Sequence, residues 1–315
     1  MTYKILISDG LSEAGVNLLK TAGEVVVNPK ITAEELIAAL PGYHALVVRS
    51  RTRVNAKVIA AGANLKVIGR AGVGVDNIDV AAAMAQGILV VNSPLAASIS
   101  VAELTLAMML ALARTVPAAD ASMKQGRWDK SAFVGAELHG KMLGLLGLGR
   151  IGLEVAKRAR AFEMSVAAYD PYLSDAQIRE RGAEPCSFDD VLARADYVSL
   201  HLPLTKETHN LLGAAQFARM KKGARIVCLA RGGVIDEAAL GTALDSGQLA
   251  GAALDVFAAE PVSAGAIAEH PKVIATPHIG AQTQEAQTRA GLAIAEEVLK
   301  VLQGREPRFR VTAND

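Results

Sequence analysis

The sequence predicts an α/β protein built from two doubly wound parallel-sheet domains. Short apolar strands alternate with helices along almost the whole chain, which is typical of parallel sheets covered by helices. Hydrophobic residues make up 51% of the sequence but aromatic residues only 4%, so the cores depend on Ala, Val, Leu and Ile, as in strands buried on both faces. A length of 315 residues suits two such domains.

The N-terminal part of the chain alternates strands with short helices. Ser12 is expected to cap the first helix. Thr32 is expected to cap the second, because Glu35 completes a capping-box pattern. Strands are expected at residues 4–8, 25–27, 45–49, 66–68 and 88–91, and helices at residues 12–21, 33–40, 55–61 and 79–86.

A long apolar segment, residues 98–114, is expected to form a helix that is buried on most faces, between domains or between subunits. The only tryptophan, Trp128, follows in a loop-like segment, residues 126–140, which is too long for a bare connection. We interpret this segment as a contact of a homodimer or a dimer of dimers rather than as a surface excursion.

The central feature of the chain is a glycine-rich turn between a strand and a helix. An apolar strand, residues 142–146, leads into Gly147-x-Gly149-x-x-Gly152. Gly147 permits a tight turn, Gly149 lets a pyrophosphate approach the backbone, and Gly152 lets the following helix pack close to the strand. That helix, residues 151–162, directs its N-terminal amides at the phosphates. The pattern predicts a dinucleotide site; the alternative is an ordinary strand–turn–helix.

A second strand, residues 165–169, ends in Asp170, which lies 18 residues after Gly152. A carboxylate in this place accepts hydrogen bonds from the hydroxyls of an adenosine ribose and repels a 2′-phosphate. Neither Pro171 nor Tyr172 supplies a cation beside it, so the sequence predicts NAD rather than NADP as the cofactor.

Strands and helices alternate again after the turn. Strands are expected at residues 197–200, 225–229, 251–255 and 273–276, and helices at residues 188–194, 214–218, 237–246 and 283–302. The last helix is expected to return to the first domain. A Rossmann dinucleotide-binding domain, residues 97–283, is therefore inserted into a flavodoxin-like substrate domain, residues 1–96 and 284–315. The final segment, residues 305–315, is polar and is expected to be frayed.

The charge balance and the cysteines exclude several function classes. With 33 basic and 32 acidic residues the formal net charge is +1, so neither nucleic acid nor a membrane surface is an expected partner. Cys186 and Cys228 are too few for a disulfide framework and too far apart for a metal-ligand pair, so we expect two buried thiols and no metal. No signal-peptide pattern and no unbroken membrane-spanning run is present, which predicts a cytoplasmic protein.

Polar side chains follow successive strands of the second domain, where open parallel sheets bind ligands. His278 is the candidate general base for the proton of a substrate hydroxyl during hydride transfer. A carboxylate such as Glu260 fixes the tautomer of the ring when it binds the far ring nitrogen. Arg231 presents a planar fork to a substrate carboxylate. Taken singly, each of these residues could instead be a structural or solvent-exposed side chain. His201, which also follows a strand, is the alternative candidate for the general base.

At this point six stretches carry a family resemblance that spans nearly the whole chain. They are residues 48–52 (VRSRT), 69–77 (GRAGVGVDN), 144–152 (GLLGLGRIG), 230–233 (ARGG), 253–257 (ALDVF) and 277–280 (PHIG). On these stretches the chain resembles the D-2-hydroxyacid dehydrogenase family, most of all its D-3-phosphoglycerate branch. The resemblance implies an NAD-dependent homodimer or larger oligomer with Arg231, Glu260 and His278 as catalytic residues.

The resemblance also implies the binding residues. Those for NAD are Gly147, Gly149, Arg150, Ile151, Gly152, Asp170, Pro203, Ala230, Asp255 and Gly280; Asp255 is implied to orient the nicotinamide carboxamide. Those for the substrate are Arg49, Ser50, Arg51, Val73, Gly74 and Arg231, and the loop around Val73 is implied to offer backbone amides to the substrate carboxylate.

The expected reaction is oxidation of D-3-phosphoglycerate to 3-phosphohydroxypyruvate, as in serine biosynthesis. Period-2 alternation would place Arg49, Arg51 and Arg53 on one face at a strand end, as a patch for a second anion. The chain departs from the pattern of the D-3-phosphoglycerate branch in two places; the first weakens the substrate prediction, and the second concerns inhibition by serine. Ala97 stands where that branch usually has an asparagine that contacts substrate. The chain stops at residue 315, where many relatives continue into a serine-sensing domain, so direct serine inhibition is not expected.

Two alternatives remain open. Within the same class, the substrate is hydroxypyruvate, glyoxylate or a sulfonated 2-hydroxy acid. In another class, the chain is an NADH-sensing corepressor-like protein that binds partner proteins. Turnover followed by NADH absorbance separates the enzymes from the binding protein, and a substrate panel separates the enzymes from one another.

Overall fold

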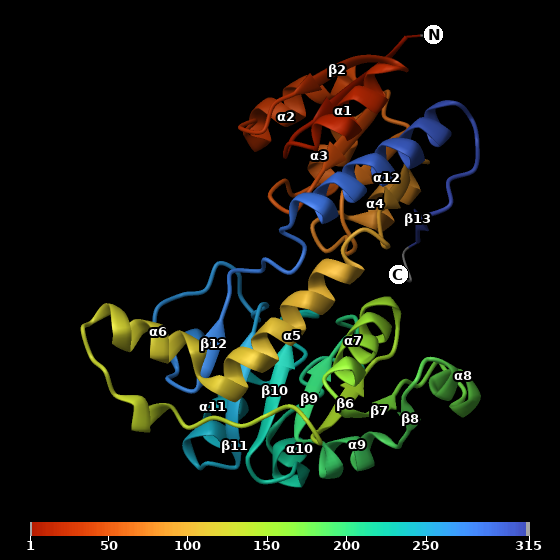
Figure 1. Ribbon diagram of the computed structural model, residues 1–315. Helices are drawn as coiled ribbons and strands as arrows, with labels where there is room; N and C mark the ends of the chain where they lie inside the picture. The colour runs from red at the N-terminus through yellow and green to blue at the C-terminus, as the bar shows by residue number, and fades with distance from the viewer. Residues whose placement is uncertain (1, 313–315) are drawn as a thin grey trace. The chain divides into compact units, whose positions relative to one another are not determined.

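The computed structural model describes residues 2–312 and divides the chain into two compact units. Unit 1 combines Met1–Ser98 with Ala281–Asp315, and unit 2 is Ile99–Gly280. Each unit contains a parallel sheet with helices packed on it (Figure 1). The two-domain α/β fold expected from the alternating pattern is thereby confirmed.

Unit 1 contains a six-stranded sheet in the order β13-β5-β4-β3-β1-β2, parallel except for β13. Its strands are β1 (Tyr3–Ile7), β2 (Gly23–Val27), β3 (Ala45–Val48), β4 (Val67–Arg70), β5 (Leu89–Asn92) and β13 (Arg310–Val311). Its helices are α1 (Glu13–Lys20), α2 (Ala33–Ala39), α3 (Ala56–Ala61), α4 (Val80–Ala85) and α12 (Gln284–Leu302), with the 3-10 turn η1 (Leu40–Gly42).

Local sequence signals set the helix starts of unit 1. The hydroxyl of Ser12 caps α1, and Thr32 and Glu35 form the expected capping box of α2. Helix α12 packs closely on the sheet, because a Cβ at Gly69 of β4 would lie 2.7 Å from a methyl of Val298. A glycine at this position therefore lets the last helix of the chain belong to the first domain, as the sequence predicted.

The expectation that residues 305–315 are frayed is wrong for the residues that the structure describes. Strand β13 pairs antiparallel with β5, and Val311 is 4% exposed. The buried carboxylate of Glu297 accepts a hydrogen bond from the Phe309 amide at 2.9 Å. The edge of β5 offers unpaired backbone groups that even a short polar segment can satisfy. Residues 313–315 lie outside the described part of the chain.

Unit 2 contains a seven-stranded parallel sheet in the order β12-β11-β10-β9-β6-β7-β8. Its strands are β6 (Met142–Leu146), β7 (Ser165–Tyr169), β8 (Glu184–Pro185), β9 (Tyr197–Leu200), β10 (Ala224–Cys228), β11 (Leu249–Leu254) and β12 (Val273–Ala275). Its helices are α5 (Ser98–Arg114), α6 (Val116–Lys124), α7 (Arg150–Ala161), α8 (Asp175–Glu180), α9 (Phe188–Arg194), α10 (Ala214–Arg219) and α11 (Glu237–Asp245), with η2 (Lys130–Phe133) and η3 (Ile267–Glu269).

The strand order of unit 2 reverses at β6. From β6 the chain passes to β7 and β8 on one side and then to β9, β10, β11 and β12 on the other. Such a reversal opens a crevice beyond the carboxyl ends of the two strands at the switch, which is where open α/β sheets bind nucleotides. A nucleotide site is therefore expected at the loops that follow β6 and its neighbouring strands.

Helix α5 and the segment after it were only partly anticipated. Nine residues of α5 are buried, in line with the expected long buried helix. Helix α6 was not expected, and Trp128 in the next loop is 82% exposed. Among residues 2–312 no single helix is long and apolar enough to cross a membrane; α5 and α6, bent by 65°, meet that test only as a pair, by length and composition.

Candidate active site

The glycine-rich turn after β6 has the geometry that a dinucleotide phosphate requires. Gly147 has φ 92°, and a Cβ on it would lie 2.5 Å from the carbonyl oxygen of His201. A Cβ on Gly152 would lie 2.4 Å from the Gly147 oxygen, so neither glycine can be replaced without a shift. By contrast, a Cβ on Gly149 would meet no atom within 4 Å. Helix α7 begins at Arg150 without a side-chain cap, so its first amides face this open side.

Asp170 follows β7 and is tied to the same turn. Its Oδ2 accepts a hydrogen bond from the Leu148 amide at 2.9 Å, and its Oδ1 accepts one from the Tyr172 amide at 3.0 Å. A carboxylate has about four lone-pair directions, so both oxygens can still accept from ribose hydroxyls. Together, the open glycine turn, the uncapped helix and this carboxylate fit the pyrophosphate and adenosine ribose of a dinucleotide.

Arg181 is a participant that the sequence did not reveal. Its Nη1 donates to the carbonyl oxygen of Leu148, the residue whose amide binds Asp170. The Leu148 peptide groups are thus held from both sides. Arg181 follows α8, a short helix that the apolar pattern did not predict, so no signal placed its guanidinium at the turn. The Arg181 guanidinium therefore lies near the turn, on the side of Asp170, although Pro171 and Tyr172 supply no positive charge there.

The loop after β10 carries Arg231. Its guanidinium is half-buried, and its Nη1 donates to the Ala230 oxygen at 2.7 Å. A Cβ on Gly232 would lie 1.7 Å from the Phe257 oxygen, so the loops after β10 and β11 touch through their backbones. Burial raises the pKa of the Cys228 thiol to about 11, so this thiol stays protonated at neutral pH and is no nucleophile.

The loops after β11 and β12 bring Glu260 and His278 together. Oε2 of Glu260 lies 2.9 Å from Nδ1 of His278, as the sequence predicted. The other carboxylate oxygen accepts a hydrogen bond from the Phe257 amide at 3.1 Å, which orients the carboxylate from within its own loop. Both side chains are accessible, the His278 side chain at 50% and that of Glu260 at 37%, so a substrate can reach the ring.

Asp255 anchors the histidine loop from both sides. It is 1% exposed and accepts hydrogen bonds from the amides of Ile279 and Gly280, each at 2.8 Å, and from the hydroxyl of Thr276. His278 lies between these contacts with φ 54°, a left-handed conformation that is uncommon for residues other than glycine. Observed backbone outliers of this kind cluster at functional sites and are held by surrounding contacts.

The competing base, His201, lies elsewhere. It follows β9, and two strands, β10 and β11, separate β9 from β12 in the sheet. Its Nε2 lies 2.9 Å from the Ser199 hydroxyl, while its Nδ1 is buried and has no partner among the described residues. Burial lowers the pKa of His201 to about 4, so the ring is neutral near pH 7. Its backbone packs against Gly147, which makes it part of the glycine turn rather than of the Glu260 pair.

Other residues implied to bind the cofactor lie on the same strand-end loops. Arg150 is exposed and Ile151 half-buried at the start of α7, and the Pro203 oxygen accepts a hydrogen bond from the Thr208 hydroxyl at 2.7 Å. Ala230 is buried beside Arg231. Within residues 2–312, no group of three or more His, Cys, Asp or Glu side chains is placed to hold a metal ion.

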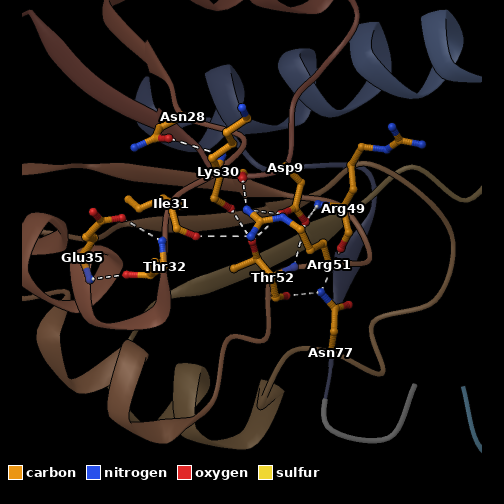
Figure 2. A network of polar contacts seen from close by, with 11 residues as sticks. Asp9, Asn28, Lys30, Ile31, Thr32, Glu35, Arg49, Arg51, Thr52 and Asn77 are labelled. Atoms are coloured by element: carbon orange, nitrogen blue, oxygen red, sulfur yellow. Dashed lines mark hydrogen bonds and ion pairs between the residues drawn. The ribbon is translucent and has the colours of Figure 1, made fainter. Parts of the chain in front are cut away.

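The expected face of three arginines in unit 1 is wrong. Strand β3 ends at Val48, so residues 49–53 form a loop without strand alternation. Figure 2 shows the Arg51 guanidinium turned toward the backbone of Ile31 and the Asp9 carboxylate, with Arg49 directed away from it. The Arg51 charge thus has partners within the fold, while the Arg49 guanidinium contacts, among the described residues, the Gln282 side chain at 3.4 Å.

The second substrate segment of the sequence prediction, around Val73 and Gly74, is also held by its own unit. The Asn92 side chain donates to the Val73 oxygen at 2.7 Å, and the Ser93 amide donates to the Gly72 oxygen at 2.9 Å. Gly72 has φ 152°, a backbone conformation that residues other than glycine rarely adopt, so a side chain at this position would be strained. The backbone of this loop is therefore fixed by the end of β5.

Comparison with known proteins decides the family. Residues 106–280, more than half of the chain, match the family described as D-isomer specific 2-hydroxyacid dehydrogenase, NAD binding domain. The chain belongs to this family. Unit 2 accordingly contains the NAD-binding domain of this family, in agreement with the glycine turn and Asp170.

Relatives with an assigned name point to one branch of the D-isomer specific 2-hydroxyacid dehydrogenases. A D-3-phosphoglycerate dehydrogenase of Methanocaldococcus jannaschii is 51% identical over 302 residues, and one of Archaeoglobus fulgidus is 48% identical over 303. Each alignment covers 96% of this chain but 58% of the relative, so the chain spans little more than half the length of these proteins.

Solved structures share the whole fold of the chain. A protein of Thermus thermophilus is 37% identical with a TM-score of 0.88, and the match covers 98% of this chain and 100% of that one. A glyoxylate reductase of Paecilomyes thermophila is 29% identical, also with a TM-score of 0.88, over 100% and 99% of the two chains. A D-2-hydroxyisocaproate dehydrogenase is 25% identical with a TM-score of 0.87, over 98% of this chain and 100% of that one, so similarity of fold spans more than one substrate.

Proposed function

We propose that the chain is an NAD-dependent oxidoreductase that transfers a hydride between a 2-hydroxy acid and nicotinamide, with D-3-phosphoglycerate oxidised to 3-phosphohydroxypyruvate. The observation that carries the proposal is the hydrogen bond between His278 and Glu260, at 2.9 Å, beside the loop of Arg231 in an NAD-binding domain. The names of relatives at about half sequence identity support the substrate and a place in serine biosynthesis.

The residues divide the chemistry among them. Bound NAD supplies the hydride acceptor. Because Nδ1 of His278 is bound to Glu260, the tautomer with its proton on Nδ1 leaves the Nε2 lone pair to accept the substrate hydroxyl proton. Glu260, held by the Phe257 amide, then stabilises the charged ring. Arg231 binds the substrate carboxylate through its planar fork and orients the carbon that loses the hydride.

A substrate panel tests this proposal. NADH absorbance is followed with D-3-phosphoglycerate and, in the reverse direction, with hydroxypyruvate, glyoxylate and a sulfonated 2-oxo acid. The expected result is the highest kcat/KM for the phosphorylated acid. A higher value for glyoxylate would move the chain to the class of its 29% identical structural neighbour. No turnover of any acid would contradict the dehydrogenase assignment and leave a binding protein.

We also propose that the protein is a homodimer or a dimer of dimers in the cytoplasm. An open hollow of about 620 Å³ lies between α5, α6 and η2 and includes Met123, Trp128, Phe133 and Val134 in its lining. Trp128 and Val134 are 82% and 86% exposed, and apolar patches of this kind commonly mark protein interfaces. Two free cysteines are compatible with a reducing compartment.

A further inference from the structure

Two side chains of unit 1 clamp the loop of residues 49–52. Asp9 follows β1, and its side chain is 2% exposed. Its Oδ2 accepts hydrogen bonds from the amide of Arg49 at 2.7 Å and the amide of Thr52 at 3.0 Å. One carboxylate oxygen therefore joins the backbone donors at the two ends of the loop (Figure 2).

Asn77 completes the clamp from the opposite side. Its Nδ2 donates to the carbonyl oxygens of the same two residues, Arg49 at 2.8 Å and Thr52 at 2.7 Å. The backbone carbonyl oxygen of Asn77 accepts a hydrogen bond from the Val54 amide at 2.8 Å. The amide and carbonyl groups of both loop ends are thus occupied by an acceptor, Asp9, and a donor, Asn77, that are far apart in sequence.

Arg51 balances the charge of the clamp. Its Nη2 lies 3.2 Å from Oδ1 of Asp9, and its Nη1 donates to the Ile31 oxygen at 3.2 Å. The guanidinium also donates to the Ser8 oxygen, at the end of β1. A buried carboxylate is costly unless it is paired and hydrogen-bonded, and Asp9 satisfies both conditions. Arg51 thus supports the loop instead of extending toward a ligand.

The clamp leaves the middle of the loop available. Ser50 is exposed, and among the described residues its hydroxyl, its amide and the amide of Arg51 have no hydrogen-bond partner. These donors directly follow Arg49 in the chain, and backbone amides together with a guanidinium suit an oxyanion. Asn77 also ends the segment that begins with the glycine loop at residues 72–74, so it joins the two candidate anion-binding segments.

We propose that Asp9 and Asn77 are positioning residues for the substrate anion: they fix loop 49–52 in the shape that presents Arg49 and Ser50, at a set distance from the amides of residues 72–74. The proposal rests on the function proposed above, because the anion is a group of the 2-hydroxy acid. Neither residue touches substrate in this account. Each acts on affinity by ordering the loop in advance, which lowers the entropy lost on binding.

The main test compares Asn77→Ala with Asn64→Ala. Asn64 makes the same kind of contact in the same unit, from its Nδ2 to the Pro41 oxygen at 2.7 Å, but before β4 rather than after it. Steady-state kinetics with D-3-phosphoglycerate and NAD are combined with hydrogen exchange of the peptide that contains residues 49–52. Asp9→Asn is a second variant, which keeps the shape of the side chain and removes its charge.

The expected result for Asn77→Ala is a rise in KM for the acid of about 10-fold to 100-fold, since the loop and its side chains must then be ordered when the anion binds. The kcat value and the KM for NAD should change by less than about twofold, the pattern of lost uniform binding. Hydrogen exchange at residues 49–52 should become faster. Asn64→Ala should leave all of these quantities unchanged, and Asp9→Asn should resemble Asn77→Ala.

Failure of this proposal is separable from failure of the proposed function. If the unmodified protein turns over the acid and Asn77→Ala keeps the same KM, the positioning role is overturned while the enzyme assignment stands. If the unmodified protein turns over none of the acids, the function fails, and hydrogen exchange still decides the clamp. Unchanged exchange at residues 49–52 in Asn77→Ala overturns it. A fall in kcat and rise in both KM values together would indicate general damage and also count against it.

Discussion

Nδ1 of His278 lies 2.9 Å from Oε2 of Glu260, although the two residues follow different strands and are 18 positions apart. Two sets of hydrogen bonds to the neighbouring loops position the two side chains. The Phe257 amide turns the Glu260 carboxylate, and Asp255 holds the residues on both sides of His278. Because both sets of hydrogen bonds are made within the protein, the pair is arranged before substrate or cofactor binds.

Loss of the ring should therefore remove proton transfer and little else. His278→Ala is expected to lower kcat by roughly 10²-fold to 10⁴-fold, the usual range for a general acid–base group, while the affinity for NAD changes little. Glu260→Gln should cost less, because an amide can still fix the ring. Steady-state kinetics and NAD titration measure the two effects. Near-full turnover of His278→Ala, with a large loss for a variant of His201, would transfer the role to His201.

The preference for NAD over NADP should depend on two residues, Asp170 and the neighbouring Arg181. Asp170→Ala is expected to weaken NAD binding by about 1–3 kcal/mol, the cost of one or two hydrogen bonds to a charged group. The same change should improve NADP, because Arg181 binds the Leu148 oxygen next to the site and can meet a 2′-phosphate.

The double variant Asp170→Ala with Arg181→Ala separates these effects. It should lose the gain for NADP while keeping the loss for NAD, as measured by KM for each dinucleotide. Equal use of NAD and NADP by the unmodified protein would contradict the role of Asp170. An unchanged NADP gain in the double variant would contradict the role of Arg181.

The oligomeric state should respond to the exposed apolar side chains beside α6. The unmodified protein is expected to be at least a dimer, and Trp128→Lys with Val134→Lys should favour the monomer, because two desolvated charges would stand in the interface. Light scattering at micromolar concentration measures both species. Tyr172→Lys, at another highly exposed aromatic residue of unit 2, is the control. A monomeric unmodified protein would contradict the proposal.

Local signals account for what the sequence predicted well. The bounds of β6, β7, β9 and α9 agree with the expected ranges at both ends, since apolar periodicity and capping residues operate within a few positions. The order of strands follows from connectivity rules, which place Arg231, Glu260 and His278 after neighbouring strands. The hydrogen bond between Glu260 and His278 was accessible to such reasoning.

Long-range partners account for what the sequence missed. Nothing near Arg51 indicates that its guanidinium binds Asp9 and the Ser8 oxygen, which precede it by 42 and 43 positions. Arg181 reaches back 33 positions to Leu148. A short polar segment such as β13 finds its partner only where the edge of β5 already exists. In each case the contact joins residues that are far apart in sequence. Such a contact forms only in the folded protein and produces no periodic pattern in the sequence.

The remaining prediction concerns stability and pH at His201. Burial lowers its pKa from 6.5 to about 4, and its Nδ1 is buried with no partner among the residues described. The unfolded chain therefore binds a proton more readily than the folded chain. The stabilising contribution is complete above pH 6.5 and is lost as the pH falls from 6.5 toward 4, with an upper bound of about 3 kcal/mol.

Urea unfolding above pH 6.5 and again near pH 4 measures this loss. His201→Gln cannot take up the proton, so its free energy of unfolding should fall less over that interval than the value for the unmodified protein. His139→Gln is the matched control, because the His139 side chain is 68% exposed and pairs with the exposed Glu163. Its stability should follow the unmodified curve. Parallel curves for His201→Gln and the unmodified protein would mean that other groups set the acid limb, and that the buried ring contributes nothing to it.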